Sequence, residues 1–191
     1  FTASKNTITS VEGIFSGCSS ISDFDSEIFA NMPKLQSAKE SFKDCTSLSS
    51  IITDINPFDG CTNLQDVSGF FRGCANLQGS VPVSMFNSCR KVLKTTNSMF
   101  YGCEELNGNI SVGNEDTTSS EASSYQLGLL AECLSLTNTS YMFYNCKKLT
   151  GAIPWDIFYT KSVEHLYTQL KDVSHMFHNC GFGTPTTYND T

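Results

Sequence analysis

The residues of this chain that could do chemistry are its cysteines and histidines. Its 191 residues include nine cysteines and three histidines. A cysteine can serve as a nucleophile, a metal ligand or half of a disulfide, and spacing helps to tell these roles apart. Successive cysteines are widely spaced, and even Cys61 and Cys74 are 13 residues apart. Zinc ligands instead come in close pairs such as Cys-x-x-Cys, so the spacing argues against a zinc site.

All nine cysteines fall at one place in a recurring frame, Phe-x-x-Cys-x-x-Leu, which Phe143, Cys146 and Leu149 show in full. Self-similarity of this kind is typical of stacked repeat proteins. A cysteine at the same place in each repeat is expected to be reduced and buried, where its weak S–H can donate to a backbone carbonyl. We therefore expect two sets of free thiols. The first is an inward ladder of Cys18, Cys45, Cys74, Cys103, Cys146 and Cys180, and the second, on the outer-turn side, comprises Cys61, Cys89 and Cys133.

The histidines do not suggest catalysis. His175 and His178 follow a β-prone run, and on a strand their odd offset would point them to opposite faces, which argues against a shared metal. His165 lies in a candidate helix and is expected at the surface. No Ser/His/Asp set is indicated by spacing, and no glycine-rich phosphate loop follows a strand. The sequence therefore predicts a protein that is not an enzyme, with no catalytic residue, no metal site and no cofactor.

The copies of the frame are of two kinds that alternate, so the full period is about 28 residues. One kind follows a short β-prone run such as 67–70, and the other follows a proline or an acidic turn, as Phe86 does. One unit is expected to be a short strand, a bend at the cysteine and a brief helical or 3₁₀ turn. The phenylalanines of the first kind should stack as one buried column, and they are Phe15, Phe42, Phe71, Phe100, Phe143 and Phe177.

Two segments resemble the Leu-x-Gly-x-Ile-Pro part of leucine-rich repeats: 77–82, Leu-Gln-Gly-Ser-Val-Pro, and 149–154, Leu-Thr-Gly-Ala-Ile-Pro. The Phe-x-x-Cys-x-x-Leu frame is closer to one branch, the BspA-like surface repeats of secreted or lipid-anchored bacterial proteins and some protist surface proteins. The resemblance covers roughly 11–180. It implies an α/β repeat fold, a right-handed leucine-rich-repeat-type solenoid with short parallel strands on one face and helical or irregular outer turns.

We expect a single domain over 1–191, with repeats over about 11–180 and a polar tail over 181–191. Residues 111–124 lack apolar periodicity and are expected to form a solvated insertion loop, either a tolerated insertion or a partner-contact loop. Residues 162–173 show the best helical periodicity in the chain.

Composition limits the partners. Twelve Lys and Arg against nineteen Asp and Glu give a net charge of −7, which argues against nucleic acid because no basic cluster is present. The longest apolar run is too short to span a bilayer. No signal peptide is visible, so a location at the cell surface or outside the cell is implied only by the resemblance. Sequons stand at Asn109, Asn138 and Asn189, and the sequence leaves open whether they carry glycans.

Aligning the units suggests a binding site. One position after the core phenylalanine and two positions before it, the residues change from small or charged to aromatic toward the C-terminal end. The candidate ligand-binding residues are Tyr101, Tyr141, Tyr144, His175 and His178. If these positions face solvent, they offer contact area for recognition; the alternatives are ordinary half-buried strand aromatics, or two ladders on different faces.

Two functions follow. The first is a non-catalytic binding module of a cell-surface or secreted protein, mediating adhesion to or recognition of protein or carbohydrate on a host or neighbouring cell surface. The second is a structural protein of an assembly, such as a phage fibre, a capsid decoration or a surface array. Both functions are compatible with the chain being part of a larger chain or assembly.

Overall fold

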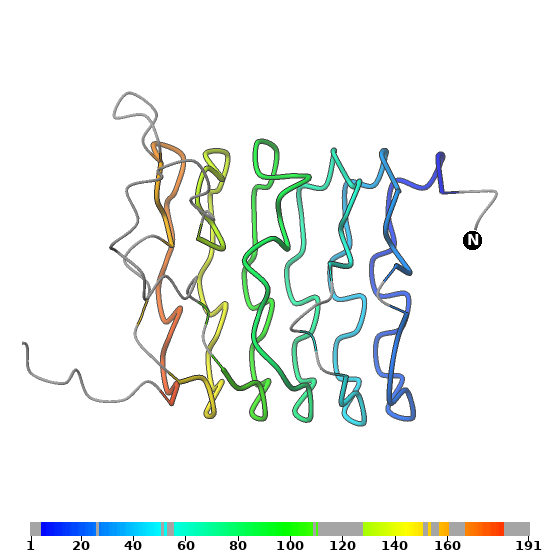
Figure 1. Ribbon diagram of the computed structural model, residues 1–191, viewed down its shortest axis with the longest axis vertical. Coiled ribbons are helices and arrows are strands. Elements are labelled where there is room, and N and C mark those ends of the chain that lie inside the picture. The colour runs from blue at the N-terminus through cyan, green and yellow to red at the C-terminus, as the bar shows by residue number, and fades with distance from the viewer. Residues whose placement is uncertain are drawn as a thin grey trace, which may run out of the picture.

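The computed structural model describes residues 5–25, 27–50, 52, 56–108, 110, 128–150, 153, 157–160 and 167–181. The insertion loop 111–124, His165, and the tail beyond residue 181 lie outside the described residues. The chain runs up and down in elongated coils placed side by side, from the N-terminus at the right of Figure 1 to the last coil at its left. The described residues contain no helix, and their only β-structure consists of isolated bridges.

Six residues mark the successive coils, because each forms a parallel bridge to the next. They are Ser10, Ser37, Asp66, Thr95, Asn138 and Asp172. The step from Thr95 to Asn138 includes the predicted insertion and is longer than the three steps before it, yet the parallel bridge is kept. The additional residues therefore leave the stacking of the coils intact.

Backbone hydrogen bonds join each coil to the next at four regularly spaced positions. In the second coil the N–H groups of Ala38, Glu40, Phe42 and Asp44 donate to carbonyls of the third coil over 2.7–2.9 Å. The same four repeat positions donate at all five junctions between bridged coils. Of the N–H groups between them, those of Ser41 and Lys43 close local turns with the carbonyl three residues earlier. Alternate backbone donors thus stabilise the coil and the stack.

Left-handed residues explain why the predicted strands are reduced to single bridges. Two positions in each unit, two before and two after the core phenylalanine, have φ between 53° and 75° in all six coils. At Gly73, for example, φ is 75°, and an added Cβ would collide with Oδ1 of Asp44 in the preceding coil. Such residues bend the backbone sharply, so an extended strand cannot continue through them.

The bridge position itself carries a recurring side chain that the sequence analysis missed. In every coil it is Ser, Thr, Asp or Asn, and its side-chain oxygen accepts from the N–H two residues later. The Ser68 N–H, for instance, donates to Asp66 Oδ1 over 2.8 Å. These side chains start the turn by satisfying a backbone donor locally. Their spacing of five residues before each core phenylalanine is the sequence signal that identifies them.

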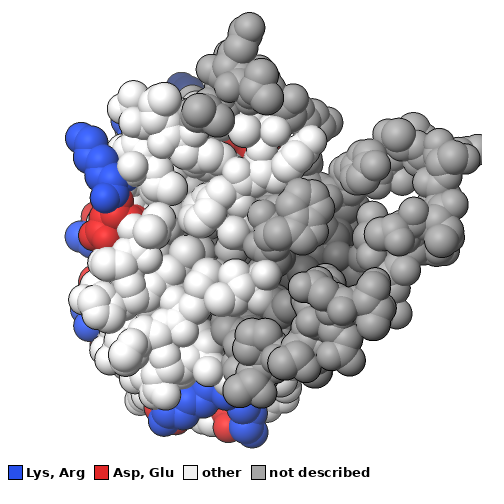
Figure 2. All heavy atoms as spheres, turned by 90° about the vertical axis from the view of Figure 1, so that its left-hand side faces the viewer, with Lys and Arg blue, Asp and Glu red and all other residues white. Residues whose placement is uncertain are grey.

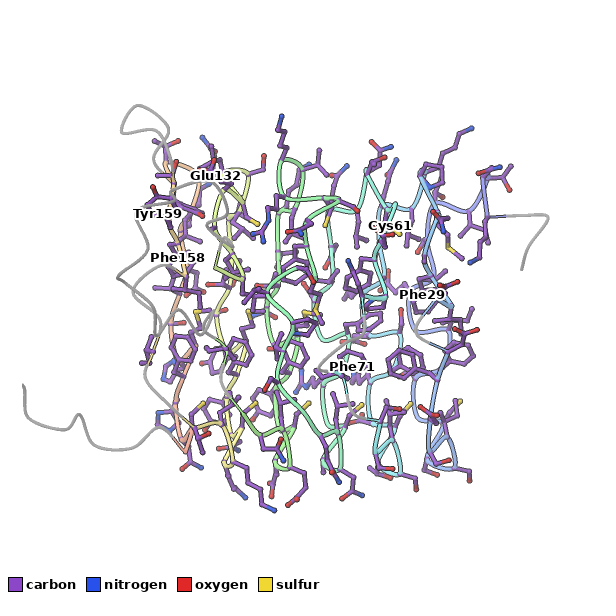
Figure 3. The ribbon with its side chains drawn as sticks, viewed as in Figure 1. Phe29, Cys61, Phe71, Glu132, Phe158 and Tyr159 are labelled. Atoms are coloured by element: carbon purple, nitrogen blue, oxygen red, sulfur yellow. The ribbon has the colours of Figure 1, made fainter. Side chains whose placement is uncertain are left out.

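The predicted phenylalanine column is confirmed. Each successive pair is stacked, with ring centroids 5.1–5.8 Å apart and interplanar angles of 2–26°. The four interior rings are at most 1% exposed, whereas Phe15 and Phe177, at the two ends, are half-buried. Figure 3 shows Phe29 and Phe71 inside the coils, where rings from both kinds of copy meet; Phe29 lies 5.9 Å from Phe70.

The cysteines form the predicted ladder, with one exception. All nine thiols are free, and those of Cys45, Cys74, Cys103, Cys146 and Cys180 each donate to the carbonyl of the core phenylalanine in the preceding coil, over 2.9–3.1 Å. Cys61 makes the same bond to Phe29 in the second set. The prediction is wrong for Cys18, which is exposed, because the described residues include no coil before its own.

The predicted helix over 162–173 is not helical where it is described, from 167 onward. The N–H groups of Lys171 and Asp172 both donate to the carbonyl of Thr137 in the preceding coil. These bonds between coils replace the bonds of a helix. The handedness of the coils and their assignment to the leucine-rich-repeat type stay predictions.

Replacing Cys74 by serine should lower the free energy of unfolding by about 1–3 kcal/mol, because a more polar hydroxyl then occupies a fully buried site. The same change at exposed Cys18 should cost less than about 0.5 kcal/mol. Urea denaturation of both variants measures the difference. Equal costs at the two positions would contradict the ladder.

Candidate functional site

The five candidate residues come together on one surface, which we call the aromatic comb: Tyr101, Tyr141, Tyr144, His175 and His178. Along one row, Tyr144 stacks between Tyr101 and His178, with centroids 4.8 and 4.9 Å away. Along the other row, the ring of Tyr141 stacks on the ring of His175, with centroids 4.8 Å apart and an interplanar angle of 4°. The rows are neighbours, since Tyr141 and Tyr144 are 5.6 Å apart. The alternative of two ladders on different faces is therefore excluded.

The expectation that His175 and His178 point to opposite faces is wrong. Their ring centroids are 5.6 Å apart. The period of two assumed for a strand fails here because the segment is a turn: the His178 N–H donates to the carbonyl of His175, and His175 has φ 55°. The two rings consequently share the comb.

The comb presents the edges of its rings. Within each row the rings are nearly parallel, at 4–12°, so neighbouring rings cover one another's faces. The Arg72 guanidinium lies 4.9 Å from the centroid of Tyr101 and extends the first row by one coil. The three tyrosines are half-buried and the two histidines exposed. A ligand therefore meets ring edges, hydroxyls and imidazole nitrogens, which suit polar contacts combined with apolar area.

Two of these aromatic residues occupy backbone positions that favour glycine. Tyr141 and His175 have φ 58° and 55°, in the left-handed region where a bulky side chain costs about 1–2 kcal/mol. The first and third coils have Gly13 and Gly69 at the same position. Glu40 and Ser98 hold the same position outside the comb with φ 53° and 54°, so this left-handed conformation belongs to every coil and does not by itself mark a binding site.

The described residues hold no cluster of three or more His, Cys, Asp or Glu side chains that could bind a metal ion. The buried thiols are poor nucleophiles, because burial raises their pKa values well above the usual 9.0 at Cys103 and Cys146, and to about 12 at Cys89 and Cys133. A nucleophilic cysteine requires the opposite shift. The arrangement offers recognition through the comb in preference to thiol chemistry.

The buried cation Arg90 joins the coil before the insertion to the coil after it. Arg90 is 7% exposed, and its Nη1 donates to the carbonyls of Gly128, Leu129 and Ala131 over 2.6–3.1 Å. Its Nε donates to Asn87 and its Nη2 to the carbonyl of Val83. Arg90 borders an open groove of about 700 Å³, but its donors are engaged by the protein itself. Its role is structural: it fixes the coil that follows the insertion onto the coil before it.

Residues 4–112, more than half of the chain, match the family described as Mycoplasma protein of unknown function, DUF285. The chain belongs to this family, and the matched part includes the first four bridged coils. There is no significant match among curated proteins or among solved structures. Within the described part of the chain, no helix has the length and apolarity needed to cross a membrane.

The buried thiols make the free energy of unfolding depend on pH in the alkaline range. The folded-state pKa values of Cys89 and Cys133 lie near 12, above the ordinary 9.0, so the folded chain keeps protons that the unfolded chain loses. Their contribution is complete below about pH 9 and is lost as pH rises from 9 toward 12, by about 1.4 kcal/mol per pH unit and thiol.

We therefore expect the free energy of unfolding to fall steeply from pH 9 upward in urea titrations. The variant Cys89→Ala/Cys133→Ala should show a shallower fall, since lysines and tyrosines titrate in both proteins alike. If the free energy of unfolding fell with pH at the same rate in both proteins, these thiols would ionise as readily in the folded chain as in the unfolded chain.

Proposed function

We propose that this chain is a non-catalytic binding module of a cell-surface or secreted protein, which mediates adhesion or recognition through the aromatic comb. The proposal includes the finer family assignment, a BspA-like leucine-rich repeat protein with a right-handed solenoid fold. The phenylalanine and cysteine ladders and the parallel bridges at regular repeat positions support that assignment. Location on the cell surface or outside the cell is part of the same proposal.

The observation that carries the proposal is the pair of neighbouring rows of stacked aromatic residues in the comb. Repeat scaffolds expose the same positions in every coil and can vary them without altering the core. Here the varied positions are aromatic only in the coils of Tyr101, Tyr141 and His175. In the first three coils they are small or charged, as at Ser16 and Lys43. A local cluster of this kind on a regular scaffold is typical of a recognition surface.

Of the two ligand classes, protein fits the geometry better than carbohydrate. A sugar ring stacks on an exposed aromatic face, but both faces of Tyr101 are covered, by Arg72 and Tyr144, and both faces of Tyr144 are covered by neighbouring rings. The exposed ring edges and polar tips suit a protein surface that supplies hydrogen bonds and apolar side chains. We therefore favour a protein on a host or neighbouring cell as the ligand.

A structural role in an assembly is the second candidate. It is favoured by large hydrophobic side chains that remain exposed in the described residues, among them Ile14 at 38% and Val173 at 47%, because such side chains offer apolar area for contacts within an assembly.

The test is binding of the purified chain to arrays of host-matrix proteins and glycans, followed by Tyr101→Ala/Tyr144→Ala. The double variant should lose binding by at least about tenfold and keep most of its melting temperature, since both side chains are only half-buried. Tyr141→Gly should also lose binding while its stability stays equal or rises, because glycine relieves the strain at φ 58°.

Lys43→Ala is the matched control, since Lys43 holds the same repeat position as Tyr101 and Tyr144 but lies outside the comb. Its binding should be unchanged. Unaltered affinity in the double tyrosine variant would discard the comb as the site, and selective capture of glycans would replace protein by carbohydrate as the ligand.

A further inference from the structure

The comb lies on a part of the surface that has no carboxylate of its own. The turns that hold the comb and Arg72 contain no Asp or Glu, although the chain has 19, and these turns are residues 67–73, 96–102, 139–145 and 173–179. Arg72 is the one Lys or Arg among them. The equivalent turns of the first two coils do contain acidic residues, namely Glu12, Glu40 and Asp44. The comb is therefore locally positive on a chain whose net charge is −7.

The carboxylates that border these turns already have partners. Glu40, which lies against Gly69, is paired with Lys43 over 3.2 Å. Glu104 and Glu105 pair with lysines of the next coil over 2.8 and 2.5 Å, and the aspartates at the bridge position accept the N–H two residues later. Figure 2 looks onto the C-terminal end of the stack: the charged side chains gather at its left edge and at the bottom, and uncharged side chains fill the part between.

Arg72 keeps its charge available to a ligand. Its side chain is exposed, and no carboxylate of the described residues pairs with it. The guanidinium lies over the ring of Tyr101, 4.9 Å from the centroid. A guanidinium that covers a ring still offers the N–H fork at its edge, which matches the two oxygens of a carboxylate. Arg72 is therefore a cation held in place by Tyr101 at the start of the comb.

The tyrosine hydroxyls continue this row of donors. Within the part of the chain that the structure describes, no hydrogen bond engages the hydroxyls of Tyr101, Tyr141 or Tyr144. Each hydroxyl can donate, whereas an ionised carboxylate only accepts. An acidic side chain of a ligand is consequently satisfied along the whole row. A lysine or arginine of a ligand would instead meet Arg72 and no carboxylate.

We propose that the comb and Arg72 together bind an acidic segment of a protein, with a ligand carboxylate on the Arg72 guanidinium and the rest of the segment against the ring edges. This inference rests on the proposed function and names the chemistry of the partner. Because charges more than about 8 Å apart are largely screened at physiological salt, the local positive charge decides against the net charge of −7. Nucleic acid, by contrast, requires several clustered cations.

The test uses the full chain and two random copolymers of opposite charge, glutamate–tyrosine and lysine–tyrosine. In biolayer interferometry the chain should bind the glutamate–tyrosine copolymer in preference to the other, which is the reverse of what its net charge of −7 predicts. Binding should weaken as sodium chloride rises from about 50 mM to about 500 mM, because salt screens the pair at Arg72.

The variants Arg72→Glu and Lys34→Glu form a matched pair. Both change the net charge equally, and both side chains are exposed, so the melting temperatures should stay near that of the unchanged chain. Arg72→Glu should weaken binding of the glutamate–tyrosine copolymer by at least about tenfold, because it places a carboxylate against those of the ligand. Lys34→Glu lies outside the comb and should weaken it by less than about twofold.

Preference for the lysine–tyrosine copolymer, binding of neither copolymer, or equal losses in the two variants would overturn the proposal. Preferential capture of heparin would also overturn it, in favour of a sulfated glycan. The proposed function can survive each of these outcomes. If the protein found on the arrays is basic or uncharged and Tyr101→Ala/Tyr144→Ala loses it, the comb is the site and only the acidic partner is wrong.

Discussion

A coil of this protein can complete its backbone hydrogen bonding only against the next coil. Four N–H groups of each unit point along the stack, and the N–H groups between them close local turns. Unpaired buried donors are costly, so every unit requires a neighbour of the same shape. That requirement fixes the repeat positions, because left-handed residues must stand two before and two after each core phenylalanine. The phenylalanine and cysteine ladders fill the interior that this backbone encloses.

The cysteines also form hydrogen bonds between neighbouring coils. A phenylalanine carbonyl inside the stack accepts both a local N–H and the thiol of the following coil, as the Phe42 carbonyl does from Cys45 and Cys74. A thiol is small and only weakly polar, so it can be buried at this place with a modest hydrogen bond. The regular burial of cysteine is therefore an architectural property, and the elevated thiol pKa values follow from it. The exposed surface remains free to vary, and there the comb is built.

Much of this arrangement could be predicted from the sequence, because it depends on spacing. The frame around Phe71 and Cys74 predicted the stacked rings and the free thiols, and the alignment of units brought Tyr101 and Tyr144 into one row. The relation between His175 and His178 was missed because a period of two was assumed where a left-handed residue makes a turn. The side chains at the bridge position were missed because Ser, Thr, Asp and Asn look unrelated until their shared oxygen acceptor is considered.

The effect of a unit's position in the stack on the burial of its side chains could not be predicted from the sequence either. Cys18 stands in the same repeat frame as its equivalents, yet it is exposed because the described residues supply no coil to cover it. The same holds for Val173, whose equivalent Val67 is fully buried. A pattern of residues describes a unit, whereas burial depends on the units at either side. Arg90 adds a second non-local case, since the carbonyls it binds lie 38–41 residues further along the chain.

The dependence of each coil on the next is tested most directly by amide hydrogen exchange, resolved by NMR, on a dilute sample. The N–H groups of Glu40, Gly69 and Tyr141 hold the same repeat position, and each donates to the following coil. They should exchange slowly and with similar protection, whereas the N–H of His175, at that position in the last coil, should exchange orders of magnitude faster. Equal exchange at all four positions, or fast exchange at the three interior ones, would contradict the account.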